Sequence, residues 1–109
     1  MEFKELLQFI EKQDGKLARS YEKGHDKEKR VLARAVKLAE EAGELCSEVL
    51  SYNKNQSQEK MDKHDAESLA DEVADVLITT LLLAKNMDVD IQGALKNKIE
   101  KINEKFEGI

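Results

Sequence analysis

Apolar residues recur every three or four positions along most of this chain, the spacing that places them on one face of an α-helix. The first such segment covers residues 2–13, with Leu6 and Ile10 among its apolar positions. Asp14 and Gly15 follow it, and this pair favours a turn. We therefore predict that the first helix ends there.

Three further segments show the same periodicity. The longest is followed by a polar, aperiodic stretch at 51–65, which we predict to be a surface loop. Asp90 is well suited to cap the start of the last helix. The pattern predicts an all-α fold, with a single domain over residues 1–109 and four helices at about residues 2–13, 27–50, 66–85 and 90–107.

The segment 72–84 differs from the others because it is apolar almost all the way round. Glu72, Asp75 and Thr79 share one narrow stripe, and nearly every other position is apolar. A helix of this kind is expected to be buried, and a chain of 109 residues builds only a modest core. We therefore expect burial between subunits as well as within one. Two buried carboxylates are unfavourable unless cations or hydrogen-bond donors compensate them.

Composition narrows the classes of function. The net charge is −5, and each basic run is interleaved with acids, which argues against a surface for nucleic acid. The longest uncharged run begins at Val76 and stops before Lys85, about half the length needed to cross a bilayer. The charged N-terminus does not resemble a signal peptide. Cys46 is the only cysteine and is expected in the core, which fits a reducing cytoplasm.

Acidic residues occur in two pairs with a spacing of three, Glu41 with Glu44 and Glu72 with Asp75. This spacing places both members of a pair on one helix face, about 5–6 Å apart at Cβ. If the two helices pack side by side, four carboxylates converge and repel one another. Mg²⁺ and Mn²⁺ prefer such oxygen ligands, and an oxygen-only site with open positions suits phosphate chemistry.

The residues alone leave other interpretations open. Glu41 and Glu44 also fit an ordinary solvated helix face, since the chain has 23 acidic residues. Glu72 and Asp75 could instead form buried salt bridges with Lys or Arg. Di-iron bundles are excluded because they need Glu-x-x-His on two helices, and only Glu22 and His25 have that spacing here. The chain also lacks the Cys/His spacing of zinc sites and a glycine-rich phosphate loop.

The two acidic segments together resemble a known family. Residues 38–45 read LAEEAGEL and residues 72–77 read EVADVL. This combination is similar to the MazG-type nucleotide pyrophosphohydrolases, of the all-α NTP pyrophosphatase superfamily. Their signature is Glu-Glu-x-x-Glu followed, after a spacer, by Glu-x-x-Asp. The resemblance implies a small four-helix module that assembles as a homodimer or homotetramer.

The resemblance also implies an activity and a set of residues for it. The activity is Mg²⁺-dependent hydrolysis of nucleoside triphosphates between the α and β phosphates, with Mn²⁺ as a possible substitute, in nucleotide-pool house-cleaning. The products are a monophosphate and pyrophosphate. By position, the metal ligands are Glu41, Glu44, Glu72 and Asp75. Glu40 would act with Glu41 in catalysis by orienting or activating water. Lys98, Asn103 and Lys105 would contact substrate, although Ile102 holds the position where the asparagine is expected.

Two alternatives belong to other classes of protein. The first is a non-catalytic helical oligomer, a scaffold or regulatory partner, with its acids in salt bridges to Lys37, Lys98 or Lys101. The second is a nucleotide-binding module that has lost turnover.

Overall fold

The computed structural model describes residues 1–55 and 63–109. These residues form four α-helices and no strand, which confirms the predicted all-α class. The helices are α1 (Phe3–Arg19), α2 (Lys27–Asn55), α3 (Lys63–Asn86) and α4 (Ile91–Lys105). Within the described ranges, none of them combines the length and the apolar character needed to span a lipid bilayer.

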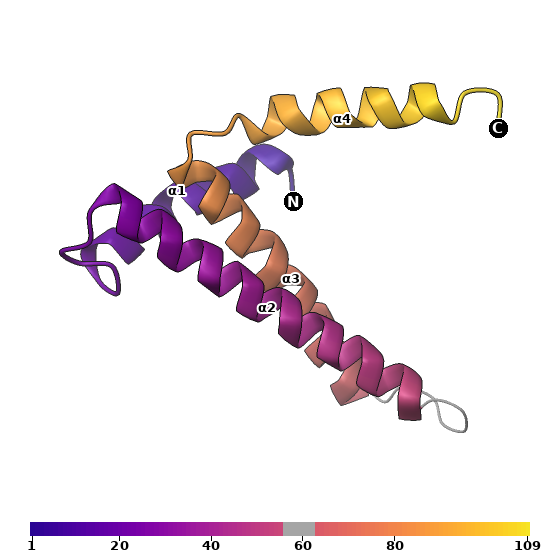
Figure 1. Ribbon diagram of the computed structural model, residues 1–109, viewed down its shortest axis with the longest axis horizontal. Coiled ribbons are helices and arrows are strands. Elements are labelled where there is room, and N and C mark those ends of the chain that lie inside the picture. Colours follow the sequence, from indigo (N-terminus) through magenta and orange to yellow (C-terminus); the bar gives the residue numbers. More distant parts are fainter. Residues whose placement is uncertain (56–62) are drawn as a thin grey trace.

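The two long helices, α2 and α3, run antiparallel and side by side, and α1 packs against the C-terminal end of α3 (Figure 1). After α3 the chain turns, and α4 extends away as a separate arm (Figure 1). The radius of gyration is 17.2 Å, against about 13 Å for a compact domain of this length. One chain therefore leaves much of its helical surface uncovered.

The buried apolar core is small and lies where α1 meets α3. It consists of Ile10, Leu81 and Leu82, and the partly buried residues packed against it are Leu6, Leu17, Ile78 and Ile91. Along the apolar segment 72–84, however, Val73 and Leu77 remain exposed. Burial was expected partly within one chain and partly between subunits, and within one chain α1 and α2 cover only part of the circumference of α3.

Helix α1 continues through Asp14 and Gly15 to Arg19, so the predicted end at residue 13 is wrong. A glycine inside a helix lowers stability by about 1 kcal/mol relative to alanine. Tertiary contacts offset this: Leu17 packs on the core, and the Asp14 carboxylate lies 2.7 Å from Arg34 and 2.9 Å from Arg30. Long-range contacts thus outweigh the local preference for a turn.

A buried ionic network joins α1, the α1–α2 connection, α2 and α3. Arg34 and Glu22 are 3% and 8% exposed, and the Arg34 guanidinium donates two hydrogen bonds to the Glu22 carboxylate, at 2.8 and 3.0 Å. Arg34 also donates to the Leu82 carbonyl oxygen at 3.1 Å. The buried Asn86 amide donates to Asp14 at 3.0 Å and to the same carbonyl. Charged groups, as well as apolar ones, therefore hold these elements together.

Other boundaries also differ from the sequence-based expectations. Helix α2 extends to Asn55 and α3 begins at Lys63, so the loop predicted at 51–65 is wrong at both ends, and its central residues 56–62 lie outside the described ranges. Cys46 is exposed and not part of the core, because only one face of α2 is covered. The predicted capping role of Asp90 is confirmed, since its carboxylate accepts from the Gly93 N–H at 3.1 Å.

Glu22 links the stability of this fold to pH. Burial raises the pKa of the Glu22 carboxyl, but hydrogen bonds and charges from Arg34 and Arg30 outweigh burial and hold that pKa below its ordinary value of 4.5. A carboxyl of this kind contributes stability above about pH 4.5, and that stability is lost as pH falls through the folded-state pKa.

We expect the free energy of unfolding, measured by urea titration, to decrease as pH falls below about 4.5. Glu22→Gln should flatten part of this decrease and lower stability at neutral pH, because it leaves the Arg34 charge undercompensated. Glu28→Gln removes an exposed carboxylate near the start of α2 and is the matched control. Equal pH profiles for the two variants would contradict the role given to Glu22.

Candidate metal centre

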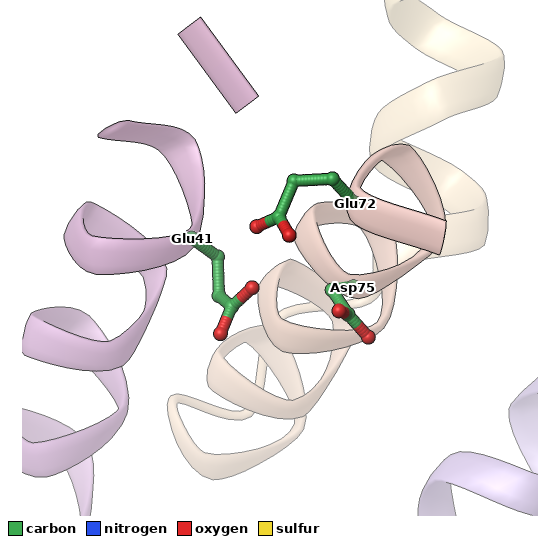
Figure 2. Close-up of side chains that lie close together, drawn as sticks. All are labelled: Glu41, Glu72 and Asp75. Carbon is green, nitrogen blue, oxygen red and sulfur yellow. The ribbon is translucent and has the colours of Figure 1, made fainter. Parts of the chain in front are cut away.

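Three carboxylates from two helices meet between α2 and α3. One oxygen each of Glu41, Glu72 and Asp75 lies within 4.8 Å of the other two. Figure 2 shows Glu41 reaching from α2 toward α3 and Glu72 reaching back toward it. The spacing of three residues on α3 places Glu72 and Asp75 on one face, and the antiparallel packing brings Glu41 opposite that face.

Burial within the cluster is the reverse of what the sequence suggested. Glu41 is only 7% exposed, Glu72 is half-buried and Asp75 is exposed. The apolar surroundings of Glu72 and Asp75 in the sequence favoured burial for those two. The side of α3 that carries Asp75 remains open, whereas Glu41 lies in the contact between the helices.

One cation neighbours the three acids. The Lys37 ammonium lies 3.1 Å from one oxygen of Glu41. The second oxygen of Glu41 and one oxygen of Glu72 are buried without a hydrogen-bond partner. Among the side chains that the structure describes, no Lys or Arg forms an ion pair with Glu72 or Asp75. The cluster therefore carries more negative charge than its protein neighbours neutralise.

The pKa values of the cluster reflect this crowding. The neighbouring Glu41 carboxylate, followed by burial and by the charges of Glu41 and Glu44, raises the pKa of Glu72 to about 7. A protonated Glu72 can donate a hydrogen bond to Glu41, and this, together with the Lys37 ammonium, holds the pKa of Glu41 below its ordinary value. The two shifts therefore run in opposite directions, and the higher pKa is that of Glu72.

The donor set suits a hard divalent cation. All three ligands are carboxylates, and two of them present buried oxygens without partners, which are costly to leave unpaired. Mg²⁺ binds oxygen ligands at about 2.0–2.1 Å and usually takes only a few carboxylates, keeping its remaining positions for water and phosphate. Glu41, Glu72 and Asp75 could hold such an ion.

The two remaining acids of the motif lie outside this group of three. Glu44 is exposed, but its charge helps to raise the pKa of Glu72, so it lies close to the cluster. Glu40 is also exposed, and its carboxylate is 3.9 Å from the Lys37 ammonium.

The structure does not bring the expected substrate-binding residues to the carboxylates within one chain. Lys98, Asn103 and Lys105 are exposed on α4, which extends away from the α2–α3 pair (Figure 1). The Lys105 ammonium instead lies 5.6 Å from the centre of the Phe106 ring.

Sequence reasoning missed a polar contact next to the cluster. The Ser68 hydroxyl of α3 donates to one carboxylate oxygen of Glu48 of α2 at 2.7 Å. The signal was present in the spacing, because Glu48 follows Glu44 by four residues and Ser68 precedes Glu72 by four. One helical turn beyond the acids, the polar stripe therefore continues on both helices.

A model of the MazG-like family matches residues 32–109, most of the chain. The chain belongs to the MazG-like family. The matched range contains all five acids of the motif and helices α3 and α4, whereas α1 and residues 20–31 precede it. Searches of curated proteins and of solved structures found no match. The MazG-like assignment confirms the family predicted from the two acidic segments and indicates an activity of the nucleotide pyrophosphohydrolase type.

Proposed function

We propose that this protein hydrolyses nucleoside triphosphates between the α and β phosphates in a reaction that depends on Mg²⁺ and also accepts Mn²⁺. The products are a nucleoside monophosphate and pyrophosphate, and the role is nucleotide-pool house-cleaning. One observation carries the proposal: in a MazG-like chain, Glu41, Glu72 and Asp75 converge with more negative charge than the protein compensates.

Each acid has a part in this reaction. Glu41, Glu72 and Asp75 hold the metal, and Glu44 serves as a fourth ligand from the edge of the cluster. When bound, the metal offsets the negative charge of the phosphate oxygens and so favours attack by water. Glu40 orients the attacking water and accepts its proton, while the oxygen that bridges the α and β phosphates leaves with pyrophosphate.

Self-association belongs to the same proposal. The extended chain leaves apolar residues exposed on each of the four described helices, and a homodimer or homotetramer would cover many of them. They include Phe9 on α1, Leu32, Val36, Val49 and Leu50 on α2, Val73 and Leu77 on α3, Leu95, Ile99 and Ile102 on α4, and Phe106 at the C-cap of α4. Lys98, Asn103 and Lys105 can contact substrate if association brings an α4 to the carboxylates.

The direct test is an assay of purified protein against all eight common NTPs and dNTPs and several damaged ones, with Mg²⁺ or Mn²⁺. We expect equal amounts of monophosphate and pyrophosphate, and no activity in the presence of EDTA. Release of orthophosphate alone, or no product from any nucleotide, would contradict the proposed reaction.

A second candidate, the non-catalytic helical oligomer, is favoured by one contact, the Lys37–Glu41 ion pair. The two functions differ in their response to metal. A ligand that binds the folded state stabilises it by mass action, about 2.7 kcal/mol at a concentration 100 times its dissociation constant. The melting temperature of an enzyme with this metal site should therefore rise with MgCl₂, whereas that of a scaffold should not.

A nucleotide-binding module without turnover would give a third result. It would bind a non-hydrolysable NTP analogue in a calorimetric titration but release no pyrophosphate from the natural nucleotide.

A further inference from the structure

Among the described side chains, α2 and α3 are joined by a hydrogen bond on each side of the carboxylates. At one place Arg34 of α2 donates to the Leu82 carbonyl oxygen of α3 at 3.1 Å. At the other, Ser68 of α3 donates to Glu48 of α2 at 2.7 Å. The metal-ligand candidates lie between these two contacts.

The spacing is the same on both helices. Glu41 follows Arg34 by seven residues on α2, and Asp75 precedes Leu82 by seven on α3. In an antiparallel pair of helices, a residue that follows a contact on one helix faces the residue that precedes it by the same number on the other. Seven residues correspond to about 10 Å along the helix axis, at about 1.5 Å per residue. The alignment of the helices that brings Arg34 to Leu82 is therefore the same one that places Glu41 opposite Asp75.

The other contact gives the same register. Glu48 lies four residues beyond Glu44, and Ser68 lies four residues before Glu72, so these two steps are equal as well. A slip of one helical turn would move the helices by about 5.4 Å. That exceeds the 4.8 Å within which the three carboxylate oxygens now lie, so the site depends on this register.

The described apolar side chains of α2 are at most half-buried, so the buried contacts that can set the register on this helix are polar. The fully buried apolar residues of the described chain come from α1 and α3, and α2 contributes none. The buried side chains of α2 are instead Arg34 and Glu41. Arg34 is in turn held by Glu22 and Asp14, which lie in the N-terminal part of the chain that the family match does not cover.

We propose that Arg34, held by Glu22, and the Ser68–Glu48 hydrogen bond are positioning groups that fix the register of α2 against α3 and so keep Glu41 opposite Glu72 and Asp75. The consequence for metal binding rests on the proposed function, but the register does not. In this proposal, the N-terminal segment stabilises the position of Arg34, which in turn aligns the carboxylates of the site.

The chain offers a matched control in Arg30. Its guanidinium contacts Glu22 at 3.1 Å and Asp14 at 2.9 Å, as part of the same network, but it donates no hydrogen bond to α3. Arg30→Met and Arg34→Met both remove a charge from the network. Of the two, only Arg34→Met removes a contact that joins α2 to α3.

The register of α2 against α3 can be measured in the absence of metal and substrate, as a distance between two spin labels. Spin labels on Cys46 of α2 and on Thr80→Cys of α3 are both at exposed positions, and their separation measures the slide of one helix along the other. The labelled protein is diluted with unlabelled protein so that pulsed electron paramagnetic resonance detects distances within one chain. We expect Arg34→Met to shift or broaden this distance by several ångströms and Arg30→Met to leave it unchanged.

The second measurement is the affinity for Mn²⁺. The electron paramagnetic resonance signal of free Mn²⁺ is followed during titrations at a temperature below the melting temperature of each variant. We expect Arg34→Met and Ser68→Ala to weaken Mn²⁺ binding by about 10-fold or more, as is typical when groups that orient metal ligands are removed. Arg30→Met should stay within about twofold to threefold of wild type. If Arg34→Met does not fold, Arg34→Lys keeps the charge but lacks the planar donor fork, and should show a smaller loss.

An unchanged label distance and unchanged Mn²⁺ affinity in Arg34→Met, or in Arg34→Lys if that variant is used, would overturn the inference. Equal effects of Arg34→Met and Arg30→Met would also overturn it, since they would indicate a general loss of stability. If the wild type releases no pyrophosphate but the label distance moves in Arg34→Met, the proposed function fails and the inference about register stands.

Discussion

Replacing Glu72 with glutamine is expected to reduce pyrophosphate release by at least about 100-fold while the four helices remain folded. Glutamine has nearly the same shape but lacks the charge that makes a carboxylate a ligand for Mg²⁺. A bound metal contributes several kcal/mol to stabilising the transition state, and each 1.36 kcal/mol corresponds to a tenfold change in rate. Turnover is measured as pyrophosphate release, and folding by circular dichroism.

Asp71→Asn is the matched control, because it removes one negative charge from the neighbouring, exposed position of α3. It should retain turnover close to that of wild type. Without metal, Glu72→Gln should also melt at a higher temperature than wild type at pH 8, because it relieves the repulsion from Glu41 and Glu44. Turnover in Glu72→Gln equal to that in Asp71→Asn would contradict the proposed metal site.

The second large effect is expected on α4. Three apolar residues of this helix and its C-cap residue follow one another at helical spacing, and each is about half exposed: Leu95, Ile99, Ile102 and Phe106. If this face forms a symmetric interface between two copies of the chain, Ile99→Asp places two substituted residues in that interface, one from each copy. Burial of an isoleucine contributes about 1.5–3 kcal/mol, so the dissociation constant should rise by about 100-fold or more.

Sedimentation velocity tests this prediction. The wild type should sediment as a dimer or tetramer of the 12.4 kDa chain, and Ile99→Asp should shift toward the monomer. Asn97→Asp adds the same charge to an exposed polar position of α4 and should leave the assembly intact. A wild-type protein that remains monomeric at high micromolar concentration would contradict self-association.

The helices could be predicted from the sequence because their periodicity is local. An apolar face with a spacing of three to four residues specifies a helix whatever its partner, and all four predicted helices are present. The ends were less predictable. Asp14 and Gly15 favour a turn by themselves, and α1 passes through them because Asp14 contacts Arg34 and Arg30, which are distant in the sequence.

The sequence by itself also determined which acids pair on each helix, since a spacing of three residues fixes the shared face of Glu72 and Asp75. Only the tertiary structure decided that Glu41 is the most buried of them and that Glu44 lies at the edge. Those outcomes depend on how far α2 is shifted along α3. The matched spacing of Glu48 and Ser68 is visible in the sequence, but only the packing of α2 on α3 brings them into contact, as it does Arg34 and the Leu82 carbonyl oxygen.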